Sequence, residues 1–453
     1  MRRLSGLDAS FLYAETPSAH MHTLKVLRLR LPRPARRDVP SLVARALAAR
    51  MPLLPTLRLR LRRAPLSLGH PVWVEDRDLD PRAHLTHRTL GAGETLDGVV
   101  GAFASEPLDR RAPLWRMQVV EGLAPGELAL VLKIHHALAD GAAVARLVER
   151  VMGEEPPGPP VPPRTPEPSE PEPLDRHLAA FALRERARQL AELPPLLART
   201  AHGLLRAARE SPPSSPFEPS VFGGARTSFD RPLTPRRVVV TGSVPLATIR
   251  GIKARAGCRV NDVVLTVTAG ALRRYLAGRG EPVDRPLVSS VPVGLPGEPH
   301  LVGNRVSNLI VPLHVEEPRP RARLAATVAS ARRAKEAEAR LGHDLLARWT
   351  ELARPRVVRF LWHDLLRRLP RPPVNVVVSN VPGPPRELWV AGAQLIDLHS
   401  VGPLLETTGL NLTFWSYAGR LNLCALACPD HGTDLPALRA AFEAAAREMD
   451  GAI

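Results

Sequence analysis

A stretch of twenty residues, half of them proline, constrains the fold most because it divides the chain into two parts. Residues 154–173 combine these prolines with glutamates, a composition that favours extended polyproline structure and cannot pack a core. The whole chain has 453 residues, more than a single hydrophobic core usually serves. We therefore predict two domains, residues 1–153 and residues 236–453, joined by a crossover over residues 154–235.

The crossover is predicted to contain a helix. Residues 174–209 are compatible with one, but Pro194 and Pro195 stand inside it. A proline has no N–H to donate and its ring clashes with the preceding turn. The prediction is therefore a helix broken at these two prolines and followed by a loop-like region over residues 211–235.

Both predicted domains mix strands with helices. Residues 128–134 are an apolar run that reads as a strand buried on both faces. Val144, Leu147 and Val148 then recur at helical spacing, so a helix is predicted to begin near Gly141. In the C-terminal part the same patterns predict helices over residues 263–276, 321–341 and 435–449 and strands over residues 287–293, 306–314, 374–379 and 410–415. This mixture predicts an α/β (α+β layered) fold rather than a solenoid.

The composition is that of an ordinary globular protein with a large positive charge. Apolar residues make up 44% and charged residues 24%, and the formal net charge is +17. Nucleic acid, an anionic membrane surface and a phosphate-rich molecule such as coenzyme A would each suit that charge. An excess of arginine, alanine and proline also arises from a genome rich in G and C, so the charge does not identify the partner.

Cysteine content and hydropathy exclude several classes of protein. Cys258, Cys424 and Cys428 are an odd number without a Cys-x-x-Cys spacing, so we predict neither a disulfide framework nor a zinc site, and no cofactor. The N-terminus lacks the apolar stretch of a secretory signal, and no run reaches the ~18 apolar residues that span a bilayer. We expect a cytoplasmic protein whose contact with a membrane is peripheral.

The residues best suited to chemistry follow the predicted buried strand. His135 and His136 close that strand, so their side chains should point to opposite faces and only one can face a given cavity. A histidine with a pKa of roughly 6.5 can accept a proton from a hydroxyl. Asp140 could bond the imidazole, hold the turn through an arginine, or cap the helix, and Gly141 permits a tight turn.

The string from His135 to Gly141, preceded by Pro113-Leu114-Trp115, resembles the H-H-x-x-x-D-G signature of the chloramphenicol acetyltransferase-like superfamily, which includes peptide-synthetase condensation domains. Further segments resemble blocks of one of its families, the bacterial wax ester synthase/acyl-CoA:diacylglycerol acyltransferases. These segments are residues 4–12, 107–110, 113–115, 260–265, 303–307, 378–384 and 416–421. Departures are the proline-rich stretch and Asp230, which stands where an asparagine is expected.

The resemblance implies two chloramphenicol acetyltransferase-like domains with a substrate tunnel between them. Long-chain acyl-CoA would enter from one side, and diacylglycerol or a long-chain alcohol from the other. His136 would be the general base, with no acyl-enzyme required, and Asp140 would be structural, pairing with an arginine. Asn261 and Asp262 would support the channel opposite His136 or simply cap a helix. Some arginines should meet the phosphates of coenzyme A at one tunnel mouth.

Residues 357–369 form a basic amphipathic segment with Trp362 available for an interface. Such a segment is typical of a helix that lies on a membrane or a lipid droplet, and equally of a packed core helix. The enzyme would then lie at the inner membrane face or on lipid inclusions.

Three alternatives remain beside this interpretation. A condensation-type enzyme would act on carrier-bound substrates, but the chain has no room for a carrier domain. A basic nucleic-acid-binding protein would show a recognisable module with interleaved aromatic residues, whereas aromatics are only 4% here. A catalytically silent homologue is disfavoured by the intact histidine motif. We therefore predict an acyltransferase that does not bind nucleic acid.

Overall fold

The structure is a computed structural model. It describes residues 1–32, 38–63, 65, 69–153, 173–210, 224–295, 297–298, 300–341 and 345–453. The predicted proline-rich stretch, apart from its last residue, and most of the predicted loop over residues 211–235 lie outside the described residues. The description below concerns the remainder.

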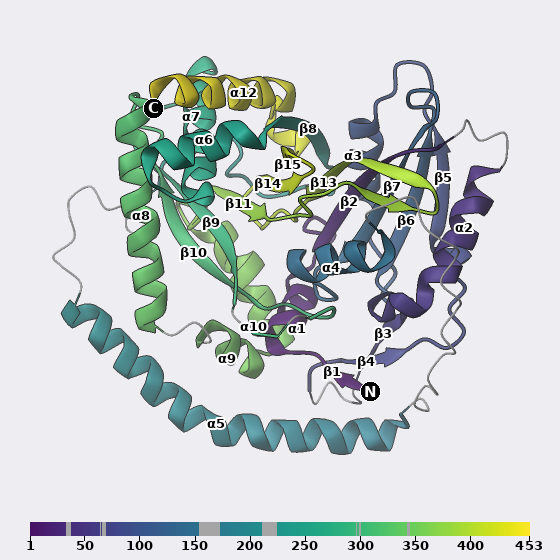
Figure 1. The fold of residues 1–453 in the computed structure, drawn as a ribbon. Helices are drawn as coiled ribbons and strands as arrows, with labels where there is room; N and C mark the ends of the chain where they lie inside the picture. Colours follow the sequence, from purple (N-terminus) through teal and green to yellow (C-terminus); the bar gives the residue numbers. More distant parts are fainter. Residues whose placement is uncertain are drawn as a thin grey trace.

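Two six-stranded sheets stand side by side and organise the molecule (Figure 1). The first sheet has the order β12 (Leu388–Val390), β13 (Ala393–Val401), β2 (His22–Arg30), β7 (Glu127–His135), β6 (Trp115–Glu121) and β5 (Leu85–Thr89). The second has the order β10 (Val306–Leu313), β9 (Leu287–Gly294), β11 (Val376–Val381), β14 (Leu410–Tyr417), β15 (Arg420–Ala427) and β8 (Val238–Pro245). A small third sheet contains β1 (Arg2–Arg3), β4 (Val72–Glu75) and β3 (Leu59–Arg62).

Helices cover both sheets, so the predicted mixed α/β class is confirmed. The N-terminal part contributes α1 (Gly6–Ala14), α2 (Val39–Arg50), α3 (Leu96–Ser105) and α4 (Gly141–Val151). The C-terminal part contributes α6 (Leu246–Ala256), α7 (Val260–Gly278), α8 (Pro320–Leu341), α9 (Leu345–Leu352), α10 (Pro355–Arg359), the π-helical turn η5 (Phe360–Leu365), α11 (Leu366–Arg368) and α12 (Leu435–Ala452). Short 3-10 turns are η1 (Met51–Leu53), η2 (Pro55–Arg58), η4 (Pro81–His84) and η6 (Pro429–His431). All nine strands and helices that the sequence predicted in the C-terminal part and around the histidines are present.

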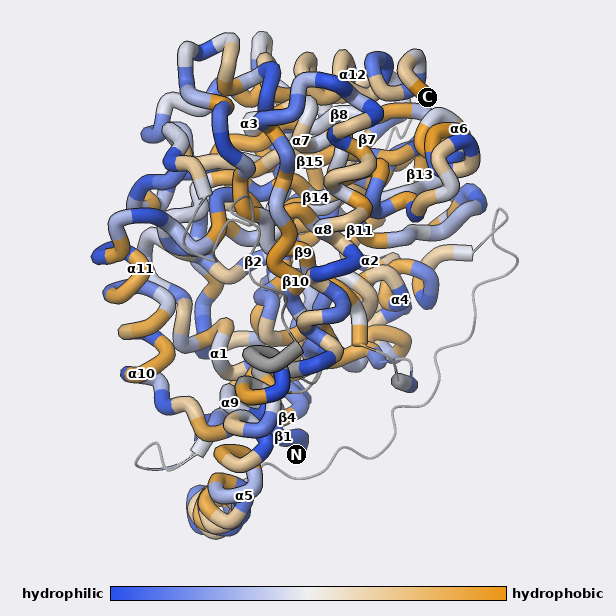
Figure 2. The backbone as a smooth tube through the Cα atoms, turned by 90° about the vertical axis from the view of Figure 1, so that its left-hand side faces the viewer, coloured by the Kyte–Doolittle hydropathy of each residue, from blue (hydrophilic) through white to orange (hydrophobic). Residues whose placement is uncertain are grey.

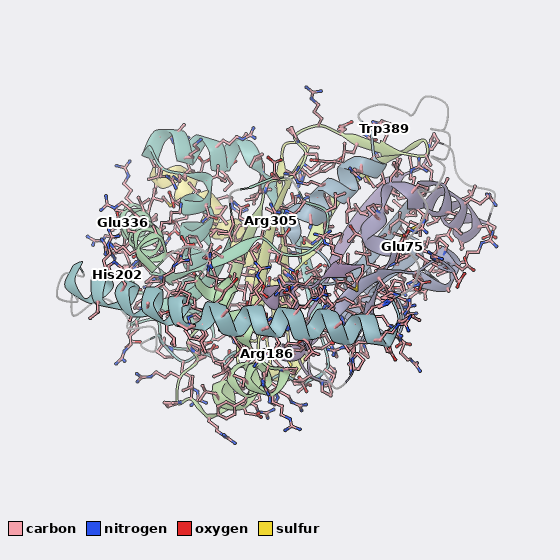
Figure 3. All side chains as sticks on the ribbon, turned by 90° about the horizontal axis from the view of Figure 1, so that it is seen from below. Glu75, Arg186, His202, Arg305, Glu336 and Trp389 are labelled. Atoms are coloured by element: carbon pink, nitrogen blue, oxygen red, sulfur yellow. The ribbon has the colours of Figure 1, made fainter. Side chains whose placement is uncertain are left out.

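The crossover helix differs from its prediction. Helix α5 (Asp175–Glu210) runs through Pro194 and Pro195 without interruption, so the predicted break is wrong. Figure 1 shows a bend in this helix instead, which is the milder consequence of removing backbone donors from a helix interior. Seen from below, α5 passes under both halves of the molecule (Figure 3), and it packs on α8 and α9.

Two strands from the predicted C-terminal domain belong to the sheet of the N-terminal domain. Strands β12 and β13 come from the predicted C-terminal domain, yet β13 pairs antiparallel with β2 of the first sheet. β13 also contacts β14 and β15 of the second sheet. Residues 388–401 therefore tie the two sheets together, and the strand that carries the histidine motif, β7, lies inside a sheet built from both parts.

Candidate active site

The histidine motif lies in a turn between β7 and α4 that both halves of the molecule hold in place. The N–H of His136 donates to the carbonyl of Met21 at 2.8 Å. The N–H of Gly303 donates to the carbonyl of Leu138 at 2.8 Å, and that of Asp140 donates back to Gly303 at 3.2 Å. Gly303 has a φ of +85°, a conformation that favours glycine. The loop before β10 is thus fixed against the motif.

A chain of hydrogen bonds determines which nitrogen of His136 carries the proton. Nδ1 of His136 lies 2.8 Å from Oδ1 of Asn304. The Nδ2 group of Asn304 donates to Oδ1 of Asp8 and to the carbonyl of His136, both at 2.7 Å. Because both amide hydrogens are used, Oδ1 must be the acceptor and Nδ1 of His136 the donor. The neutral ring therefore has its lone pair on Nε2.

That Nε2 atom is free to act as a base. Among the described residues no hydrogen bond or ion pair is made to it, and the side chain is partly exposed. Phe11 of α1 stacks on the imidazole, with ring centroids 4.3 Å apart and an angle of 18° between the planes. The stacking and the Asn304 bond together fix the ring orientation, as positioning for proton transfer requires.

Burial lowers the pKa of His136 from 6.5 to about 4. Desolvation is the main cause, the charge of buried Lys25 acts in the same direction, and Asp140 and the Asn304 hydrogen bond oppose it. His136 is therefore unprotonated at neutral pH, as a general base must be.

This lowered pKa predicts an unusual pH profile. With His136 as the expected base, the acid limb of kcat/KM should have its midpoint near pH 4, because this imidazole stays unprotonated until then. The unfolded chain takes up this proton near pH 6.5 and the folded one only near pH 4, so the free energy of unfolding should fall as the pH drops between them. Steady-state kinetics with circular dichroism at each pH separate the two effects. An acid limb near pH 6.5 from folded enzyme would contradict the assignment.

His135 points away from His136, as predicted for neighbours on a strand. Its side chain is buried, and its Nδ1 accepts from the N–H of Ala137 at 3.1 Å. Its Nε2 faces the carboxylate of Glu15 at 3.7 Å, and Nε2 of His22 lies 3.2 Å from the same group. Burial would raise the pKa of Glu15, but these histidines and Arg110 outweigh it and lower the pKa. His135 thus stabilises the end of the strand and does not share a cavity face with His136.

Asp140 caps α4 and joins the turn to the loop before β10. Its Oδ1 accepts from the N–H of Ala143 at 2.8 Å. Its Oδ2 accepts from the N–H of Arg305 at 2.9 Å and lies 3.0 Å from Nε2 of His300. The expected arginine pair is corrected here, because Arg305 contributes its main chain while its guanidinium bonds the carbonyl of Glu298.

Gly141 provides space at a close contact rather than a tight turn. Its φ is not in the left-handed region, which differs from the expected reason for a glycine here. A Cβ at this position would lie 3.1 Å from Cγ2 of Val381 at the end of β11. The absence of a side chain therefore lets α4 approach the second sheet closely.

Asn261 and Asp262 lie at the start of α7. The carboxylate of Asp262 accepts from the N–H of Arg259 at 2.9 Å, which is the helix-capping arrangement. Within the described part of the chain, no hydrogen bond or ion pair joins either residue to His136. The structure therefore brings His136, Asp140 and Gly141 together around the turn but supports only capping for Asp262.

Three residues of this site were not predicted as site residues. Asp8, Phe11 and Asn304 lie in segments that carry the family resemblance, but nothing local marks them as partners of a histidine. Asp8 is buried, and burial raises its pKa against the hydrogen bonds from Asn304 and Ser5.

Neither a metal site nor a membrane-spanning helix is found in the described parts of the chain. No group of three His, Cys, Asp or Glu side chains is placed to hold a metal ion there. None of the helices described combines the length and the apolar character that crossing a bilayer would take.

Comparison with known proteins identifies the family. Residues 4–264 match the wax ester synthase/diacylglycerol acyltransferase catalytic domain, and residues 302–450 match the WS/DGAT C-terminal domain. The chain belongs to the wax ester synthase/diacylglycerol acyltransferase family. It is accordingly an acyltransferase, as predicted.

Relatives of this WS/DGAT family member support the same assignment. A Mycobacterium tuberculosis protein with the provisional name diacylglycerol O-acyltransferase is 37% identical over 431 residues, covering 94% of this chain and 91% of that one. A second from the same organism is 33% identical over 463 residues, covering 99% and 90%. The solved wax ester synthase/diacylglycerol acyltransferase of Marinobacter aquaeolei VT8 has a TM-score of 0.71 at 26% identity, covering 99% and 98%.

The fold is also shared more widely. The first condensation domain of the CDA synthetase has a TM-score of 0.57 at 18% identity, covering 99% of this chain and 95% of that one. This likeness shows the fold alone and confirms the predicted two-part, chloramphenicol acetyltransferase-like architecture.

Proposed function

We propose that the protein transfers a long-chain acyl group from coenzyme A to the hydroxyl of diacylglycerol or of a long-chain alcohol, with His136 as the general base. One observation carries the proposal: Asn304 and Phe11 fix the imidazole with an unprotonated Nε2 that has no hydrogen-bond or ion-pair partner among the described residues. The product is triacylglycerol with the first acceptor and a wax ester with the second.

The reaction needs a single group that first accepts the hydroxyl proton and later donates it to the leaving thiolate. Nε2 of His136 takes the hydroxyl proton as the alcohol oxygen attacks the thioester carbonyl carbon. The carbon–sulfur bond then breaks, and the protonated imidazole returns the proton to the leaving thiolate. A ring whose pKa is lowered to about 4 gives up this proton readily. No acyl-enzyme and no cofactor are part of this scheme.

Ester formation with each acceptor tests the proposal. The purified protein would receive palmitoyl-CoA with dioleoylglycerol, hexadecanol or neither, and the lipid products would be identified by mass spectrometry. We expect ester with at least one acceptor. Apolar tunnels discriminate by only about 1–3 kcal/mol per methylene, so activity with both would be consistent. Folded protein that yields no ester with either acceptor would refute the proposed substrates.

We also propose peripheral contact with a membrane or lipid droplet through the segment from α10 to α11. Val357, Phe360 and Leu361 are 49%, 45% and 44% exposed, and Arg356 and Arg359 lie among them. Figure 2 shows α10 and α11 at the edge of the molecule. Trp362, which the sequence offered for this interface, is instead partly buried against the hydrophobic core.

Vesicle flotation tests this docking segment. Changing Phe360 and Leu361 to serine should strongly reduce co-flotation with vesicles of phosphatidylcholine and phosphatidylglycerol, because exposed apolar side chains provide the insertion energy. Ile310→Ser on β10, also an exposed apolar position, is the matched control and should float normally. Unchanged flotation of the double variant would eliminate this segment as the docking surface.

A further inference from the structure

Two polar side chains of β2, Thr23 and Lys25, lie on the same face of the first sheet as His136. His22 pairs with His135 in the strand register, and their ring centroids are 5.8 Å apart, so His22 shares the His135 face. Side chains alternate between the two faces along a strand. Thr23 and Lys25 are therefore on the opposite face, which is that of His136.

These two side chains form a row that leads away from the proposed base. The N–H of His136 donates to the carbonyl of Met21, so the base lies beside that residue of β2. Thr23 is two residues further along the strand and Lys25 is four, which corresponds to about 7 Å and about 13 Å. The hydroxyl and the ammonium group therefore follow the imidazole at regular steps.

The row has more hydrogen-bond donors than the protein satisfies. Thr23 is 5% exposed, and its Oγ1 has no hydrogen-bond partner among the described residues. Lys25 is 2% exposed, and in that same part of the chain Oγ of Ser400, at 2.6 Å, is the one acceptor for its three Nζ protons. Burial lowers the pKa of Lys25 to about 7. Because buried polar groups without partners are destabilising, these donors point to a ligand.

Lys25 lies where the two sheets meet. Its strand, β2, pairs with β13, and β13 contacts β14 of the second sheet (Figure 1). Nζ is 5.0 Å from the centroid of the Trp415 ring on β14. The hydrophobic cluster around Trp415 includes Leu27 and Leu398. A lipid that approaches His136 between the two sheets would therefore meet mainly apolar walls and this short polar row.

We propose that Thr23 and Lys25 bind the ester carbonyls of an acylglycerol acceptor and so select diacylglycerol, an inference that rests on the proposed function. A diacylglycerol has its free hydroxyl only a few bonds from two ester groups. With the hydroxyl oxygen at Nε2 of His136, the carbonyls extend along the row. An acceptor without carbonyls leaves the donors unpaired, and a site built to hydrogen-bond its substrate discriminates far more strongly than an apolar pocket.

An ether analogue of the same shape tests this assignment. The compound 1,2-di-O-oleylglycerol has the hydroxyl and both chains of dioleoylglycerol, with a methylene in place of each carbonyl. Given palmitoyl-CoA and equal amounts of the two acceptors, the wild type should acylate dioleoylglycerol with a roughly 10- to 100-fold higher kcat/KM. Lys25→Met, which has a side chain of similar length and no donor, should lower this preference roughly tenfold. Thr23→Val should lower it in the same direction.

A second buried lysine provides the matched control. Lys133 lies on the opposite face of the sheet, and its Nζ donates to the carbonyls of Phe103 and Glu106 at 2.7 Å and 2.8 Å. Damage to the fold slows both acceptors equally, so Lys133→Met should keep the wild-type preference. An unchanged preference in folded Lys25→Met, or in Thr23→Val if Lys25→Met does not fold, would overturn the inference.

The wild type alone separates this inference from the proposed function. Equal acylation of dioleoylglycerol and its ether analogue would overturn the carbonyl site and leave the acyltransferase assignment standing. Acylation of hexadecanol with neither glycerol lipid would do the same. Folded protein that acylates none of the three acceptors would instead refute the proposed function itself.

Discussion

Replacing His136 with alanine is expected to lower the rate of acceptor-dependent coenzyme A release by roughly 10²- to 10⁴-fold, the usual contribution of a positioned general base. The reason is that Nε2 of His136 has no partner in the part of the chain that the structure describes, whereas His135 faces Glu15 on the other side of the strand. The KM for palmitoyl-CoA should change little, because the proton transfer belongs to the transition state.

A second variant separates lost chemistry from lost structure. His136→Gln keeps a donor that can reach Asn304 but provides no base, so it should fold like the wild type and be as inactive as the alanine variant. His87→Ala on β5, an exposed histidine, serves as the control. Activity within a few-fold of the wild type for both His136 variants would show that another group takes the proton.

Replacing Asn304 with leucine is the other change with a large expected effect. It removes the acceptor that holds the proton on Nδ1 of His136 and the side-chain donor of the His136 carbonyl, while Oδ1 of Asp8 keeps the backbone N–H of residue 304. We expect kcat to fall roughly 10- to 100-fold, because the ring loses its preferred tautomer and orientation, as when an orienting carboxylate is removed from a catalytic triad. Leaving the His136 carbonyl unpaired should also cost about 1–3 kcal/mol of stability.

Measuring kcat and stability separately shows whether Asn304 positions the His136 ring or only contributes to packing. Thermal unfolding and steady-state kinetics would be measured on the same preparations, with Asn308→Leu as the control, since Asn308 lies on β10 and its side chain bonds only the hydroxyl of Ser290, at 3.3 Å, among the described residues. A lower melting temperature with unchanged kcat at temperatures where the Asn304 variant is folded would contradict the positioning role.

Most of the fold around the site could be predicted because its signals are local. The apolar run of β7, the apolar spacing of α4 and the capping residue Asp140 all lie within 25 residues of chain, where periodicity and capping act directly. The pairing of β13 with β2 could not be predicted, since a short strand carries no information about a partner hundreds of residues away.

The same limit explains which site residues were missed. His136 and Asn304 are 168 positions apart, and a Gly-Asn pair before a strand reads locally as a turn.

The proposed docking segment, from α10 to α11, also differs from its prediction. The sequence offered Trp362 for an interface, whereas the structure has a π-helical turn at η5, exposes Phe360 and Leu361 and leaves Trp362 partly buried.

The most direct test of the central claim is the balance of products when the wild-type protein receives palmitoyl-CoA with and without dioleoylglycerol. The account predicts triacylglycerol and free coenzyme A in equal amounts when the acceptor is present, and neither without it, since the alcohol must supply the attacking oxygen. Release of coenzyme A with palmitate in the absence of any acceptor would show a thioesterase instead and contradict the account.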